Sequence, residues 1–209
     1  MTARRRGLLV ALEGIDGSGK STLQRLLARR WRAEGYPVAC LHEPFDRALG
    51  SEALRTTREN PSWAAVLFTL DRWVGRPRVR AALGRPAIVL LDRSFYSTLA
   101  YQGSALSAKE RRELDRLQRG VTEVPDRVVW VRVPVREALR RVSRRGRRRA
   151  IPEQVDFLTR VDLAYAGMAR NAGWIGVDGR QPPSQVAEEV VRRLVPVVRR
   201  RLGPARRHA

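Results

Sequence analysis

The chain has 209 residues, of which 43% are hydrophobic, and its 42 lysines and arginines against 21 acidic residues give a formal net charge of +21. This length and apolar content exclude a disordered protein and predict a single domain over residues 1–209. No apolar run approaches the roughly 20 residues that span a bilayer, and a single cysteine, Cys40, excludes an intrachain disulfide and indicates a reducing, cytoplasmic setting without a membrane partner.

Short apolar runs alternate with amphipathic stretches along the chain. Five runs predict buried strands, over 7–12, 38–41, 87–91, 128–133 and 174–177. The other stretches predict helices over 20–34, 48–58, 62–83, 107–119, 135–144, 152–170 and 183–201. Ser107 and Glu110 predict a capping box, and 203–209 should form a frayed basic tail. Strands that alternate with helices indicate an α/β fold with a parallel, doubly wound, five-stranded sheet and right-handed crossovers.

The most specific chemical signal follows the first predicted strand. Residues 14–21 match G-x-x-x-x-G-K-[ST] between a strand and a helix, which is the pattern of a P-loop. Its backbone N–H groups cradle phosphate oxygens at the positive end of the helix. We expect Lys20 to reach the β- and γ-phosphates of ATP, and the Ser21 hydroxyl to ligate Mg²⁺. The predicted ATP-binding residues are Gly14, Ile15, Asp16, Gly17, Ser18, Gly19, Lys20, Ser21 and Thr22.

Asp92 and Arg93 end the third predicted strand. Carboxyl ends of strands line the ligand crevice of an open α/β sheet, so we expect this pair beside the P-loop. Asp92 would then hold Mg²⁺ or its water shell, and Arg93 would bridge donor and acceptor phosphates. Alone, the pair is equally typical of a salt bridge at a strand end, and the neighbouring P-loop favours the catalytic interpretation.

Five arginines surround Gly146 between positions 144 and 149. P-loop kinases close arginine-bearing lids over ATP because phosphoryl transfer depends on positioning and charge stabilisation. We expect a lid over about 144–150, with Arg145 and Arg149 as catalytic residues. A solvated basic loop and a nucleic-acid patch are the alternatives.

Apart from Lys20 and Lys109, all basic residues of the chain that carry a full charge are arginines. A bias this uniform indicates a genome that favours arginine codons, and a solvated basic surface. No aromatic residues interleave with the basic runs, and no helix-turn-helix pattern occurs. We therefore expect no specific nucleic-acid partner, although a basic ATP-dependent nucleic-acid-binding protein remains an alternative of another class.

Three segments carry a family resemblance: residues 13–22, 67–72 and 92–102, the last of which is similar to the family's Asp-Arg-Tyr/His loop. Together they resemble the thymidylate kinases (dTMP kinases) of the bacterial type, which belong to the nucleoside monophosphate kinases. The resemblance covers most of the chain, from about residue 7 to the final helix. It implies a P-loop NTPase fold, ATP-dependent phosphorylation of dTMP to dTDP with Mg²⁺, and a homodimer. The apolar face of 62–70 is then available to a partner copy.

The resemblance also implies a site for the acceptor nucleotide. Phe68 looks like the aromatic residue that stacks on thymine, and Arg72, one helical turn later, like the arginine that grips the acceptor phosphate. Asp16 matches the acid that binds the deoxyribose 3′-hydroxyl, and Tyr101 the tyrosine in place of a ribose 2′-hydroxyl. Position 17 holds glycine rather than the arginine of some members, which agrees with a lid that supplies the catalytic arginine.

Four further residues complete the implied acceptor site, and one of them is Glu43, directly before Pro44. Thr98 and Gln102 would line the base pocket, and Pro44 would lie beside the thymine methyl group. Because Asp16 and Pro44 follow predicted strands that we take as adjacent, we expect them to converge on one cleft.

Two stretches depart from the family pattern, both on the acceptor side. The usual Arg-Glu-Pro-Gly-Gly-Thr appears as residues 42–47, which keep only Glu43 and Pro44, and Ser94 stands where tyrosine or histidine is usual. Deoxynucleoside kinases are therefore the main alternative, with Glu43 as the base that deprotonates a 5′-hydroxyl of thymidine or a related nucleoside. That alternative leaves Arg72 without a phosphate and residues 100–102 unexplained.

Overall fold

A computed structural model describes residues 6–144, 146 and 152–204. Five strands form one sheet in which every pair is parallel, in the order β2-β3-β1-β4-β5. The strands are β1 (Leu8–Glu13), β2 (Val38–His42), β3 (Ile88–Asp92), β4 (Arg127–Arg132) and β5 (Ile175–Asp178). The predicted five-stranded parallel sheet is confirmed, and each strand end lies within one residue of its predicted position.

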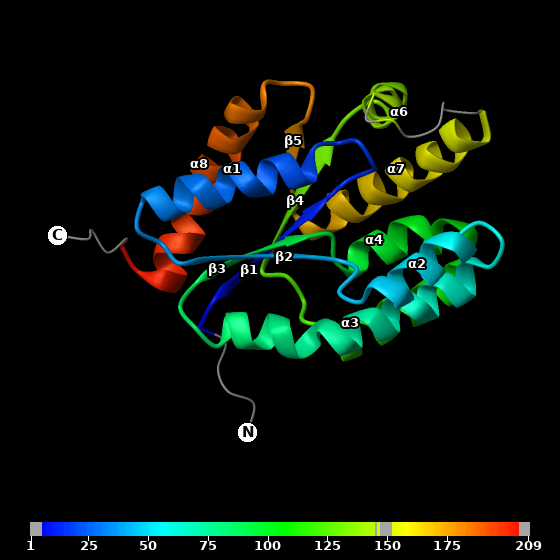
Figure 1. Ribbon diagram of the computed structural model, residues 1–209, viewed down its shortest axis with the longest axis horizontal. Coiled ribbons are helices and arrows are strands. Elements are labelled where there is room, and N and C mark those ends of the chain that lie inside the picture. The colour runs from blue at the N-terminus through cyan, green and yellow to red at the C-terminus, as the bar shows by residue number, and fades with distance from the viewer. Residues whose placement is uncertain (1–5, 145, 147–151, 205–209) are drawn as a thin grey trace.

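Helices cover both faces of the sheet, as Figure 1 shows. One face packs against α1 (Lys20–Ala33) and α8 (Pro183–Leu202). The other packs against α3 (Pro61–Leu83), α4 (Phe95–Tyr101), α5 (Ala108–Val121) and α7 (Pro152–Ala172). α2 (Arg47–Thr56) packs on α3, and α6 (Val135–Ser143) follows β4. Within the described ranges, no helix is both long and apolar enough to cross a bilayer.

The alternation of side chains along β1 explains why its sequence is apolar almost throughout. Leu8, Val10 and Leu12 pack with residues of α1 and α8. Leu9 and Ala11 face the helices of the opposite layer. All five side chains are fully buried. A strand covered on both faces shows a continuous apolar run instead of an alternating one.

One helix is absent from the sequence prediction. Residues 95–101, expected within a loop, form α4, and six of its seven residues are buried. A helix that is buried on nearly all sides shows no amphipathic stripe, so periodicity could not reveal it. The predicted capping box at the start of α5 is confirmed, because Ser107 and Glu110 exchange both expected hydrogen bonds.

The strand order corrects one expectation. β3 lies between β1 and β2, so Asp16 and Pro44 do not follow adjacent strands. Leu12 of β1 and His42 of β2 both align with Asp92 of β3. All three carboxyl ends therefore meet at one edge of the sheet, and the loops converge even though β3 separates two of them.

Glu13, the last residue of β1, joins three elements through a fully buried carboxyl group. Its Oε1 accepts hydrogen bonds from the backbone N–H (2.8 Å) and hydroxyl (2.6 Å) of Ser94. Its Oε2 accepts from the hydroxyls of Ser97 (2.7 Å) and Tyr165 (3.0 Å). Burial raises the pKa of this carboxyl group, and the hydrogen bonds oppose that shift. Glu13 thus fixes the start of α4, and the middle of α7, to the end of β1.

Replacing Glu13 by leucine should lower the free energy of unfolding by at least about 3 kcal/mol, because several buried donors lose their acceptor at a cost of about 1–3 kcal/mol each. The measurement is a urea unfolding curve of each variant. Glu34→Leu is the control, since it removes only the ion pair with Arg30 at the surface (2.6 Å) and should change the midpoint little. Equal losses in the two variants would contradict the role given to Glu13.

Candidate active site

The loop between β1 and α1 has the conformation of a phosphate cradle. Gly14, Gly17 and Gly19 have φ angles of 141°, 83° and 105°, in the region that favours glycine. An added Cβ at Gly17 would lie 2.2 Å from a backbone oxygen of α6. This contact explains why position 17 holds glycine here, since no side chain fits between the loop and α6.

Lys20 lies buried inside this loop. Its Nζ donates to the carbonyl oxygens of Gly14 (2.9 Å) and Ile15 (3.0 Å). Burial lowers the pKa of its ammonium group from 10.5 to about 8. The side chain also lines a cavity of about 580 Å³ beside the loop. A phosphate that enters this cavity meets a cation whose position the loop carbonyls already define.

The residues at the end of β3 lie where the sequence predicts, beside the P-loop. Ser21 donates a 2.5 Å hydrogen bond to Oδ2 of Asp92, and both side chains line the same cavity as Lys20. Arg93 has a positive φ of 72°, an uncommon conformation for a residue with a side chain. Its guanidinium bonds Asp16 (2.7 Å) and Ser97 (3.0 Å). The local backbone geometry therefore turns Arg93 across the carboxyl ends of β1 and β3.

A second cavity, of about 380 Å³, adjoins the first. Its lining includes all nine residues predicted to bind the acceptor: Asp16, Glu43, Pro44, Phe68, Arg72, Arg93, Thr98, Tyr101 and Gln102. Asp16, Glu43 and Arg93 line both cavities. The structure thus brings the predicted donor and acceptor residues to either side of one boundary.

Six other residues of this second cavity were not predicted from the sequence. They are Leu54, Arg55, Thr57, Arg58, Ser97 and Phe157. Ser97 lies on the same face of α4 as Thr98 and Tyr101, but no periodic pattern reveals that helix, so the position had no signal in the sequence. Arg55 and Arg58 had none either, since nothing in a surface-helix pattern shows which arginines face a cavity. Arg58 lies 5.8 Å from the centre of the Phe157 ring.

Arg72 is buried, with its guanidinium held mainly by protein groups. It forms a 2.6 Å ion pair with Glu43 and donates to the Thr98 hydroxyl (2.8 Å) and the Ser94 carbonyl (3.1 Å). Burial raises the pKa of the Glu43 carboxyl group, and the Arg72 charge opposes that shift. Arg72 therefore fixes Glu43 at the boundary of the two cavities, and its contact with an acceptor phosphate stays a prediction.

Asp71 explains how the altered loop after β2 keeps Glu43 and Pro44 in place. Its fully buried carboxylate accepts hydrogen bonds from the backbone N–H groups of Phe45 (2.9 Å) and Asp46 (2.6 Å). A cis peptide bond joins Glu43 to Pro44. Asp71 of α3 thus holds the backbone at positions 45 and 46, where the sequence departs from the family pattern. Neither of these two positions lines the acceptor cavity.

The predicted lid lies largely outside the described residues. Arg145 and Arg149 are both outside them, whereas Arg144, directly after α6, is exposed. The catalytic roles of Arg145 and Arg149 stay predictions.

Comparisons with known proteins agree with this geometry. A sequence model of the family described as "Thymidylate kinase" matches residues 12–190. The chain is 36% identical to a thymidylate kinase of Thermomicrobium roseum, with 91% of this chain and 96% of that protein covered. It is 35% identical to a thymidylate kinase of Prochlorococcus marinus (87% and 90% covered) and 32% identical to a probable thymidylate kinase of Archaeoglobus fulgidus (88% and 92% covered). The chain belongs to the thymidylate kinase family.

Proposed function

We propose that this chain transfers the γ-phosphoryl group of ATP to dTMP and so produces dTDP. The observation that carries the proposal is the pair of adjoining cavities, one built on the P-loop and the other lined by all nine predicted acceptor residues. Its family uses ATP as the phosphate donor, and the relatives named above are thymidylate kinases.

The charge of the acceptor cavity favours a nucleotide over a nucleoside. Four arginines line it, at positions 55, 58, 72 and 93, against the two acids Asp16 and Glu43. A phosphate with close to two negative charges complements such a cavity, and guanidinium groups bind it with paired hydrogen bonds. Among the described residues three of these arginines already have a carboxylate partner, since Arg55 pairs with Glu52, Arg72 with Glu43 and Arg93 with Asp16. Arg58 is therefore the guanidinium most available to a substrate phosphate, which an uncharged nucleoside lacks. The nucleoside kinase alternative therefore has less support than dTMP phosphorylation.

Phosphoryl transfer across the boundary needs charge compensation rather than a strong base. An acceptor phosphate oxygen is already a competent nucleophile, so the protein's task is to align it with the γ-phosphate and to stabilise the charge that develops. Lys20 acts from the donor side, and Arg93, which lines both cavities, acts on the groups between them. We assign Arg93 the bridging role and keep the arginines of the 144–150 lid as additional catalytic groups.

Ser21 and Asp92 are the proposed holders of Mg²⁺. Their hydroxyl and carboxylate oxygens meet at the cavity beside the P-loop, and such hard oxygen donors suit this ion. Bound there, Mg²⁺ would neutralise charge on the ATP phosphates.

The part of the acceptor cavity proposed to hold the thymine base has one apolar wall and one polar wall. Phe68 offers an aromatic face, whereas Thr98 and Gln102 offer polar groups from α4 and its end. Gln102 is fixed by a 3.0 Å hydrogen bond from its Nε2 to the Thr57 hydroxyl. The Tyr101 hydroxyl accepts a 3.0 Å hydrogen bond from the backbone N–H of Asp16, which joins the acceptor site to the P-loop.

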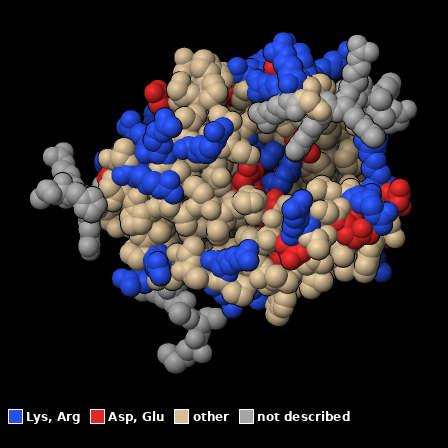
Figure 2. All heavy atoms as spheres, in the orientation of Figure 1, with Lys and Arg blue, Asp and Glu red and all other residues tan. Residues whose placement is uncertain are grey.

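The surface gives no specific support to a nucleic-acid-binding function. On the face shown in Figure 2, basic side chains are spread over many parts of the surface instead of forming one stripe. A stripe or patch of one sign is what tracks a nucleic-acid backbone.

We propose that the chain works as one kinase domain over residues 1–209, in the cytoplasm.

The apolar face of α3 supports a homodimer. Trp63, Val66, Leu70, Trp73 and Val74 are 45–55% exposed, and their spacing places them along one side of the helix. Contiguous exposed apolar side chains of this size mark protein–protein contacts. We propose that this face packs against a second copy of the chain.

The first test of the function is a comparison of acceptors in the parent enzyme. With ATP and Mg²⁺, kcat/KM for dTMP should exceed that for thymidine at least roughly a hundredfold, since two charge-assisted hydrogen bonds are worth about 3 kcal/mol or more. AMP, dCMP and dUMP complete the panel. Glu43→Gln should keep dTMP activity within about tenfold, whereas loss of a general base costs roughly 10²–10⁴. A parent enzyme that prefers thymidine and loses it in Glu43→Gln would overturn the proposal.

Glu43→Gln is a better probe than Arg72→Ala. Both substitutions break the buried ion pair, and removing one partner of such a pair costs about 3–5 kcal/mol of stability. Glutamine keeps the shape of Glu43 and an oxygen that can accept a hydrogen bond from Arg72, whereas Arg72→Ala leaves the Glu43 carboxylate without its donor. A loss of activity in that variant would therefore mix unfolding with chemistry.

A second prediction concerns the pH dependence of ATP binding. Lys20 is charged below a pKa of about 8 and becomes neutral above it, so ATP affinity should fall as pH rises through 8. If binding needs the charged form, the Kd rises by roughly tenfold between about pH 7.5 and about pH 9. Calorimetric titration with ATP measures the change. Lys20→Met should bind weakly at every pH, without this dependence; a parent curve that stays flat over the same range would refute the assignment.

The third prediction concerns the dimer. The parent should sediment at twice the chain mass of 23.7 kDa, and Leu70→Arg should shift it towards the single-chain mass. Leu163→Arg is the matched control, since this leucine is 67% exposed on α7, away from the α3 face. A parent that sediments as a single chain, or equal shifts in both variants, would show that the α3 face is not the contact.

A further inference from the structure

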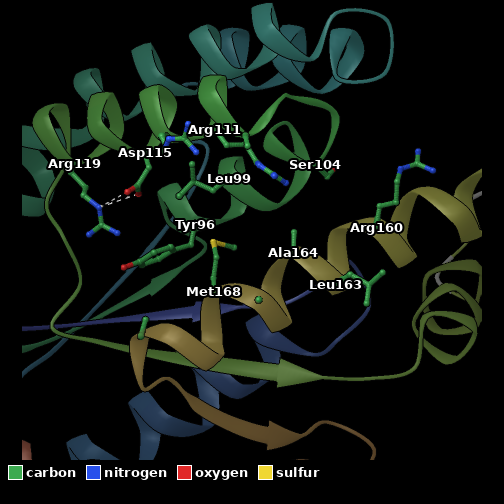
Figure 3. Close-up of a pocket in the computed structure, with 14 residues that line it drawn as sticks. Tyr96, Leu99, Ser104, Arg111, Asp115, Arg119, Arg160, Leu163, Ala164 and Met168 are labelled. Atoms are coloured by element: carbon green, nitrogen blue, oxygen red, sulfur yellow. Dashed lines mark hydrogen bonds and ion pairs between the residues drawn. The ribbon is translucent and has the colours of Figure 1, made fainter.

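A groove of about 890 Å³ lies between α5 and α7, with α4 as its floor. Figure 3 shows Arg111 and Asp115 reaching into it from α5, and Leu163, Ala164 and Met168 lining it from α7. None of its lining residues lines either substrate cavity. Its size is within the range of sites for small organic ligands. The proposed function therefore leaves this groove without a role.

The floor of the groove is apolar and aromatic. Tyr96 and Leu99 of α4 form it together with Met168. The Tyr96 ring packs edge-to-face on Trp174, with 4.7 Å between ring centres, and so has a fixed orientation. Tyr96 and Leu99 are themselves largely buried, whereas Leu163 of the same groove is 67% exposed. A flat apolar body bound here would therefore cover Leu163 and the exposed edges of the floor.

The rim of the groove is basic. Arg111 and Arg112 come from α5 and Arg160 from α7, and none of these three side chains has an ion-pair partner within the part of the chain that the structure describes. Asp115 is the sole acid among the lining residues, and Arg119 already pairs with it at 2.9 Å. The groove thus has unbalanced positive charge above an apolar floor. Its chemistry complements an anion that carries an aromatic body.

We propose that this groove binds an aromatic organic anion, and that its occupancy alters the acceptor site through α4. The flat body would lie against Leu163 and the exposed edges of Tyr96 and Leu99, and the anionic group would contact the rim arginines. The second half of the proposal rests on the function proposed above, whereas binding itself does not.

The two faces of α4 supply the connection between the groove and the acceptor site. Tyr96 and Leu99 face the groove, whereas Thr98 and Tyr101 line the acceptor cavity. Ser97, between them, bonds both Glu13 and Arg93. Because α4 has only seven residues, a ligand that shifts Tyr96 also shifts the backbone carrying Thr98 and Tyr101. Such a shift changes the affinity for the acceptor more than the affinity for ATP.

The binding test uses 1-anilinonaphthalene-8-sulfonate, a fluorescent aromatic anion, on the full chain. Titrations are made with saturating dTMP and a non-hydrolysable ATP analogue, so that both substrate cavities are occupied. Arg111→Glu combined with Arg160→Glu should weaken probe binding by roughly tenfold. Arg192→Glu combined with Arg200→Glu, exposed positions on α8, makes the same change in net charge and should leave the Kd within about twofold.

Equal Kd values in the two double variants, or loss of all probe binding when the substrates are present, would overturn the binding site. The transmission is tested separately by steady-state kinetics at increasing probe concentration. The probe should change KM for dTMP by about threefold or more in the parent and in the α8 variant, but not in the groove variant. A probe that binds the groove while KM for dTMP stays constant would overturn the transmission and leave the binding site intact. An enzyme without dTMP kinase activity would fail in the acceptor panel instead, so the two failures are distinguishable.

Discussion

The burial of one carboxyl group at the end of β1 sets the geometry of the whole site. Glu13 accepts hydrogen bonds from residues of α4 and α7, and it lies directly before the P-loop. Ser94 is one of the residues that bond to Glu13, and Arg93 directly precedes it. The backbone at Arg93 adopts a left-handed conformation, and its side chain extends across the carboxyl ends of β1 and β3. The P-loop, the bridging arginine and the acceptor helix are positioned by this one group, because a buried acceptor with several donors tolerates few alternative arrangements.

A second buried charge, Glu43, is positioned in a different way. Its ion pair with Arg72 is almost fully hidden from solvent, and such pairs contribute little net stability because desolvation offsets the attraction. What the pair provides is a defined position at the boundary between the cavities. Asp71 adds to this positioning, since its carboxylate accepts hydrogen bonds from the backbone that follows Pro44. The α3 helix thus organises the acceptor side through two consecutive residues, one of which holds a side chain and the other a backbone segment.

Much of this could be predicted from sequence, for identifiable reasons. The strands and the P-loop have local signatures, namely apolar runs and glycines at fixed spacing, and both are found where expected. α4 has no such signature because it is buried on nearly all sides. The position of β3 between β1 and β2, and the pairing of Arg72 with Glu43, depend on contacts between distant segments that local patterns do not encode. The acceptor residues were found through family resemblance, whereas Arg55 and Arg58 became visible only in the folded chain.

The surroundings of Lys20 set a limit on the drift of this chain's composition towards arginine. Its ammonium group donates to two carbonyl oxygens, at 2.9 and 3.0 Å. The surrounding loop is largely backbone, so there are few side chains that could move aside for a larger group. A guanidinium group is planar and wider, and its donors point along a fixed fork, so it cannot replace a compact ammonium in that space. The preference for arginine that holds at nearly every other basic position therefore meets a steric barrier here. The same barrier makes codon 20 a position where even the mildest exchange of one basic residue for another would be selected against.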